Sequence, residues 1–96
     1  MTGFRLSMPG KVYHAFASSD VSMVPLEEDW PEPNMYKHGP SGYVFVYDDL
    51  SAEQVEQILS HVQNVALGFA EYGPDPDTRA EGRAGLRWVR RENARQ

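Results

Sequence analysis

The stretch YVFVYDDLSAEQVEQILSHVQNVALGFAEY, residues 43–72, contains the two strongest structural signals of this chain. Residues 43–47 are consecutive β-formers that are apolar on both faces, so they predict a central strand rather than a half-exposed edge. Its two faces would present Tyr43, Phe45 and Tyr47 on one side, and Val44 and Val46 on the other. A helix can cover one face, so the proline-rich segment before the strand or a second copy of the chain would have to cover the other.

A long helix is predicted over residues 51–72. Ser51 and Gln54 have the spacing of a capping box at its start, while Gly73 and Pro74 are typical residues just beyond a helix end. A single apolar stripe runs along this helix at helical period, formed by Val55, Ile58, Leu59, Val62, Val65, Ala66 and Phe69. The helix is therefore expected to pack one face on the sheet and to show a polar face to water.

The N-terminal region predicts a β-hairpin. Apolar and polar residues alternate on both sides of Pro9-Gly10, a pair that suits the two central positions of a type II turn. We therefore expect strands at residues 3–8 and 11–17.

The C-terminal region allows two interpretations. Residues 85–90 suit a short strand, whereas Arg79 through Arg95 also contain enough Ala, Glu and Arg for a helix. The strand is favoured, because a strand, helix, strand order closes a right-handed crossover and provides Trp88 with a core to enter.

These elements predict an α+β fold, in which a small antiparallel or mixed sheet of about three to four strands packs on one long helix. Residues 1–90 are expected to form one compact domain. Within it, residues 18–42 are interpreted as a long proline-rich loop, and residues 91–96 as a basic, frayed tail.

Composition excludes several classes of protein. The chain has 96 residues and no cysteine, which rules out a disulfide framework, a thiolate nucleophile and cysteine-ligated zinc. The apolar fraction of 41% and the charged fraction of 24% are typical of a globular protein. Neither a signal-peptide pattern nor an apolar run of membrane-spanning length is evident, so no membrane partner and a cytoplasmic location are expected.

The net charge of −5 is unevenly distributed. Residues 1–78 contain three basic against twelve acidic residues, whereas residues 79–96 contain six arginines against two glutamates. The acidic body would repel phosphate, so nucleic-acid binding is not favoured. If it occurs, the expected basic contact surface is on the tail, at Arg83, Arg87, Arg90 and Arg91.

No motif for catalysis, cofactor binding or metal binding is evident. The histidines, His14, His38 and His61, lie far apart in sequence and lack metal-ligand spacing. His14 is expected to be partly buried and His61 to be solvated. The pair Asp48-Asp49 is interpreted as helix capping and solubility rather than as acid and base. We therefore expect no catalytic residue, no cofactor and no metal.

The strongest binding signal is the segment 27–36. It combines acidic residues with aromatic ones, stiffened by two prolines, which suits a protein-binding hot spot. Alternatively, its aromatic side chains fold back to cap the far face of the central strand. The predicted partner-binding residues are Glu28, Asp29, Trp30, Glu32, Met35 and Tyr36.

The sequence thus favours a non-catalytic, small acidic protein-interaction domain that binds and modulates a larger partner protein. Its size and charge are typical of accessory proteins of a bacteriophage or a bacterium, such as inhibitors and immunity proteins. One alternative is a small-molecule-binding domain or enzyme with its site at an oligomer interface, and another is nucleic-acid binding through the arginine-rich tail. A homodimer is also considered, because the predicted central strand is apolar on both faces.

Overall fold

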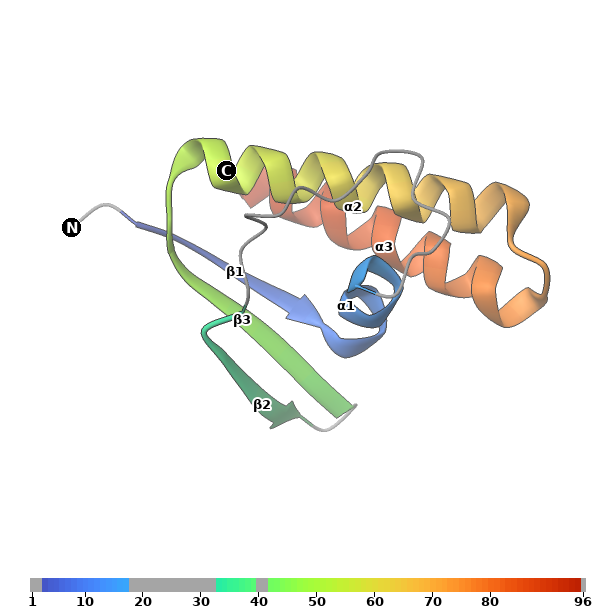
Figure 1. Ribbon diagram of the computed structural model, residues 1–96, viewed down its shortest axis with the longest axis horizontal. Helices are drawn as coiled ribbons and strands as arrows, with labels where there is room; N and C mark the ends of the chain where they lie inside the picture. Colours follow the sequence, from blue (N-terminus) through green and yellow to red (C-terminus); the bar gives the residue numbers. More distant parts are fainter. Residues whose placement is uncertain (1–2, 18–32, 40–41, 96) are drawn as a thin grey trace.

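The computed structural model describes residues 3–17, 33–39 and 42–95 (Figure 1). Its elements in chain order are β1 (Phe4–Pro9), α1 (Gly10–Ala17), β2 (Met35–Gly39), β3 (Gly42–Leu50), α2 (Ala52–Tyr72) and α3 (Pro76–Arg95). The predicted α+β class is confirmed, with three antiparallel strands in one sheet and three helices in the described part of the chain.

The sheet has the order β1-β3-β2, so the strand predicted as central does lie between two neighbours. This strand, β3, is longer than the predicted residues 43–47. Val46 and Tyr47, on opposite faces of β3, are both almost completely buried, at 2% and 1% exposure. The strand β2 lies within the predicted proline-rich loop and pairs with β3 from Met35 opposite Val46 to Gly39 opposite Gly42. Sequence reasoning missed β2 because Met-Tyr-Lys-His-Gly is too short and too polar to give a clear period.

A bulge ends the pairing of β1 with β3. Phe4 is opposite Leu50 and Leu6 is opposite Tyr47, so two residues of β3 stand against Arg5 alone. Those two residues are Asp48 and Asp49, and Asp49 adopts a left-handed φ of 57° that Asp tolerates better than most residues. The interpretation of this pair as helix caps is wrong, because Ser51 is the N-cap of α2.

The helix α2 forms as predicted. The Ser51 hydroxyl accepts a hydrogen bond from the Gln54 amide at 3.1 Å, and the Gln54 side chain accepts one from the Ser51 amide at 2.9 Å. Both bonds satisfy backbone donors that a helix start leaves without intrahelical partners. Six of the seven residues of the predicted stripe are buried, and Phe69 is half-buried.

The predicted second strand of the hairpin, residues 11–17, is wrong, because this segment forms α1. Val12, Ala15 and Phe16 are buried, at the spacing of a helix face, whereas His14 is exposed. The alternation of Val12, His14 and Phe16 fits a strand, but Val12 and Phe16 are also four residues apart and therefore lie on one face of a helix. Burial against α2 and α3 selects the helix.

The preferred strand at residues 85–90 is also wrong, because α3 runs through it. Asp75 caps this helix through a hydrogen bond of 2.8 Å from the Thr78 amide, and Pro76 occupies the first helical position. Residues 91–95, predicted to fray, belong to the same helix. Trp88 does enter the core, but from a helix, and its indole Nε1 donates to the Ser7 carbonyl at 2.8 Å.

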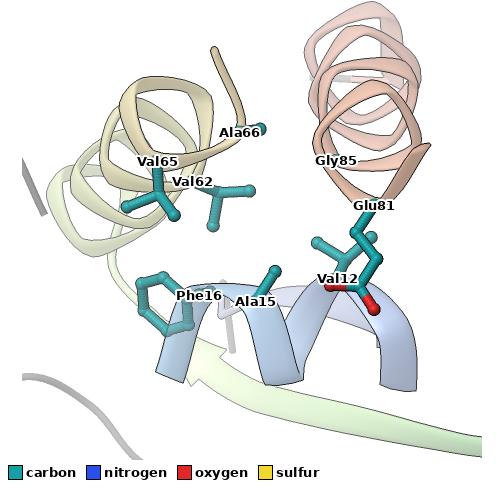
Figure 2. A pocket seen from close by; sticks show the side chains of 8 residues that line it. All are labelled: Val12, Ala15, Phe16, Val62, Val65, Ala66, Glu81 and Gly85. Carbon is teal, nitrogen blue, oxygen red and sulfur yellow. The ribbon is translucent and has the colours of Figure 1, made fainter. Parts of the chain in front are cut away.

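The three helices cover one side of the sheet (Figure 1). Helices α2 and α3 form an antiparallel hairpin, and α1 packs against both of them and against β3. Figure 2 shows Ala15 and Phe16 of α1 on the side of α2, below Val62 and Val65, while Val12 lies on the side of α3, beside Glu81. The hollow among these helices is only about 10 Å³, which leaves room for about one water molecule at most.

Small residues allow α2 and α3 to approach closely. A Cβ added at Gly82 would overlap the Ala70 backbone nitrogen and would lie 2.6 Å from the Ala66 carbonyl oxygen. A Cβ added at Gly85 would lie 2.8 Å from the Ala66 Cβ. By contrast, a Cβ added at Gly68 would meet nothing within 4 Å.

This contrast provides a matched pair of substitutions. Gly82→Ala is expected to lower the free energy of unfolding by at least about 2 kcal/mol, because the two helices must separate. Gly68→Ala is expected to raise it by about 0.5–1 kcal/mol, because Ala favours a helix and here has room. Urea denaturation followed by circular dichroism measures both changes. Equal effects of the two substitutions would contradict the close contact at Gly82.

Candidate binding surface

Four ring side chains form an array on the strands β2 and β3, in which Phe45 is half-buried and the other three are exposed. Cross-strand pairing of Tyr36 with Phe45 and of His38 with Tyr43 places all four on one face of the sheet. Ring centroids lie 4.3 Å apart for His38 and Tyr43, 6.0 Å for Tyr36 and Tyr43, and 6.2 Å for Tyr36 and Phe45. We call Tyr36, His38, Tyr43 and Phe45 the aromatic surface.

The aromatic surface lies on the helix-facing side of the sheet, where α1 covers only part of it. Phe45 is paired with the buried Met8, and the Tyr13 ring of α1 stacks on it with centroids 4.0 Å apart. Toward β2 the cover ends, so that Tyr36 is 64% and Tyr43 is 47% exposed. Aromatic side chains grouped in this way on a protein surface mark an interaction site more often than scattered ones do.

A groove of about 590 Å³ adjoins this surface. The helix α1 provides Lys11 and His14, the start of β3 provides Tyr43, and α3 provides Arg87 and Arg91. The lining residues that the structure describes include three cationic side chains and no carboxylate. Tyr43 therefore belongs both to the aromatic surface and to the wall of the basic groove.

The cations of the groove are not neutralised by the described carboxylates. Within the described part of the chain, ion pairs join Arg5 to Asp48 at 3.7 Å and Arg95 to Glu92 at 3.3 Å, and neither involves a groove residue. Lys11, Arg87 and Arg91 are all exposed. The groove consequently presents positive charge to whatever enters it.

The structure separates the predicted partner-binding residues. Tyr36 belongs to the aromatic surface, so the alternative in which it caps the far face of the central strand is wrong for this residue. Met35 pairs with Val46, lies on the opposite face and is 41% exposed. The remaining predicted residues, Glu28, Asp29, Trp30 and Glu32, lie outside the described residues.

The predicted basic surface is separated as well. Arg83, Arg87, Arg90 and Arg91 are all exposed on α3, but only Arg87 and Arg91 line the groove. Arg90 lines a different hollow, beside Gln63 of α2. Sequence reasoning missed Lys11 and His14 as their neighbours, because only the packing of α1 against α3 brings them together.

The histidines differ from expectation. His14 is exposed rather than partly buried, and His61 is buried at 6% exposure, where its ring meets the Phe16 ring edge-on at 5.0 Å. Burial lowers the pKa of His61 below its usual value, because the charged imidazolium loses hydration. The described residues contain no group of three or more His, Asp or Glu side chains placed to hold a metal ion.

Comparison of the chain with protein-family models, curated proteins and solved structures finds no match. None of the helices described above is both long enough and apolar enough to cross a membrane.

The lowered pKa of His61 predicts how stability depends on pH. The unfolded chain takes up a proton at this histidine near its ordinary pKa of about 6.5, whereas the folded protein takes it up only at lower pH. The free energy of unfolding is therefore expected to be highest above about pH 6.5 and to fall as the pH drops toward 5. Thermal unfolding monitored at several pH values measures this slope.

The variant His61→Leu serves as the comparison for this prediction. It removes the titrating group at the buried position, so its stability should change much less over the same pH range. If the stability of His61→Leu depends on pH as steeply as that of the unmodified chain, other groups cause the pH dependence.

Proposed function

We propose that this chain is a non-catalytic protein-interaction domain that binds a larger partner protein through the aromatic surface. The observation that supports the proposal is the exposure of Tyr36 and Tyr43 on the part of the sheet that the helices leave uncovered. Tyrosine is enriched in binding hot spots, since it buries a large area with few rotatable bonds.

The surface is suited to docking because it is held in place. Tyr36 and Tyr43 lie on paired strands, and the stacked rings of Phe45 and Tyr13 support them from the side of the core. A partner would not need to order these side chains on binding, which lowers the entropy lost. β2 is also an edge strand of the sheet, and no strand in the described part of the chain pairs with its outer side, where a partner strand could add.

The proposed role is the same as the one predicted from the sequence, but the proposed contact lies at a different place. The sequence interpretation placed the hot spot in the segment 27–36, of which Tyr36 lies on the aromatic surface. Tyr43 and Phe45, which the sequence interpretation assigned to strand packing, are added to the proposed contact.

A single substitution tests this proposal. Tyr36→Ser is expected to abolish recovery of a stoichiometric protein partner when the tagged chain is affinity-purified from its native cell, because the central aromatic contact is lost. With the purified partner, calorimetry should show weakening by about tenfold or more, since a hot-spot truncation costs about 2 kcal/mol or more.

Tyr72→Ser is the matched control, because Tyr72 is 77% exposed at the end of α2 and outside the aromatic surface. It should bind as the unmodified chain does. Equal binding by both variants would refute the assignment of the surface. A second copy of the chain would be the partner if no other protein is recovered, and if the unmodified chain self-associates in sedimentation whereas Tyr36→Ser does not.

A further inference from the structure

We propose that the basic groove between α1, β3 and α3 binds the phosphate backbone of a single-stranded nucleic acid, with bases stacking on Tyr43. This inference goes beyond the proposed protein-binding role, although both use Tyr43, so that a nucleic acid in the groove and a protein on the aromatic surface would compete for this ring. It rests on the three cations that line the groove and on the aromatic side chain at its wall.

The cations are arranged to meet successive phosphates. Arg87 and Arg91 are four residues apart on α3, so they project from the same helix face one turn apart. Lys11 faces the groove from α1. Guanidinium groups match phosphate oxygens with paired hydrogen bonds, while the ammonium group of Lys11 adds a point charge.

The size of the groove favours a chain of nucleotides over a single small anion. Its volume of about 590 Å³ is far larger than one phosphate group requires. Tyr43 connects it to the aromatic surface, where Tyr36 and His38 follow within 6.0 Å and 4.3 Å of the Tyr43 ring. A backbone in the groove could therefore present its bases to these rings, which is the combination that sequence-tolerant single-strand binding uses.

The net charge of −5 does not come from the residues that the structure describes. Residues 18–32 contain five acidic residues and no basic one, and so account for the entire net charge of −5. The described residues contain nine basic and nine acidic side chains and are neutral overall. Among the described residues that line the groove, none is a carboxylate.

An acidic protein segment is the competing occupant, because carboxylates would also pair with Lys11, Arg87 and Arg91. The aromatic wall favours nucleic acid, since every base offers a flat face for stacking, whereas acidic side chains offer none. Polyglutamate thus serves as the competing probe in the experiment.

The experiment measures binding of the full chain to a fluorescent oligothymidylate of about 16 nucleotides by fluorescence anisotropy. Three phosphate contacts on a single strand predict a log–log salt slope of about −2, so affinity should fall roughly 20-fold between about 50 and 200 mM salt. Absence of binding at the lower salt concentration would overturn the proposal.

Arg91→Glu and Arg90→Glu form the decisive pair of variants. They are neighbours in sequence, both are exposed and they undergo the same charge change, but only Arg91 lines the groove. Arg91→Glu should weaken binding about tenfold or more and make the salt slope shallower by about 0.7 or more, whereas Arg90→Glu should change affinity less than about threefold. If both variants lose affinity equally, the oligonucleotide is attracted to the charge of α3 in general, and the groove is not its binding site.

Tyr43 provides an independent readout of stacking. Tyr43→Ser should weaken binding of the oligothymidylate by about fivefold or more, and Tyr43→Phe should restore it, because a stacked base contributes about 1–3 kcal/mol. Polyglutamate binding as tightly as the oligonucleotide, with the same loss on Arg91→Glu, would assign the groove to an acidic protein segment instead. Arg91→Glu should leave capture of the protein partner intact, which keeps the two proposals distinguishable.

Discussion

The close contact between α2 and α3 is the constraint on which the rest of the structure depends. Gly82 and Gly85 bring the backbone of α3 against Ala66 and Ala70 of α2, where a larger side chain would push the helices apart. The rotation of α3 about its own axis follows from this contact. Trp88 is directed into the core, while Arg87 and Arg91 face the groove beside α1.

As a result, the helices contact the edge strand β1 but leave side chains of the edge strand β2 exposed. At β1, the Trp88 indole of α3 donates to the Ser7 carbonyl, so a helix side chain satisfies a backbone group of this edge strand. At β2, the helices leave Tyr36 and His38 exposed. An exposed edge strand is a liability that proteins ordinarily cover or charge, and an aromatic array beside one is consistent with a use in binding.

Prediction succeeded where one local signal dominated. The capping box at Ser51 and the long apolar stripe specify α2 without reference to other elements, and a run of β-formers specifies β3. It failed at α1 and α3, where short segments were compatible with two periods. For α3 the caps were present in the sequence, as Asp75 followed by Pro76, but the preference for a crossover strand outweighed them.

The sequence by itself determined the α+β class, the helix α2, the central strand and the set of arginines near the C-terminus. Only the tertiary structure decided which of those arginines lie together, because neighbours such as Arg90 and Arg91 line different grooves once α3 is packed. It also decided that Lys11, Tyr43 and Arg91 line one groove, although they are far apart in the chain. Local patterns carry periodicity, whereas the meeting of distant side chains requires the packing of whole helices.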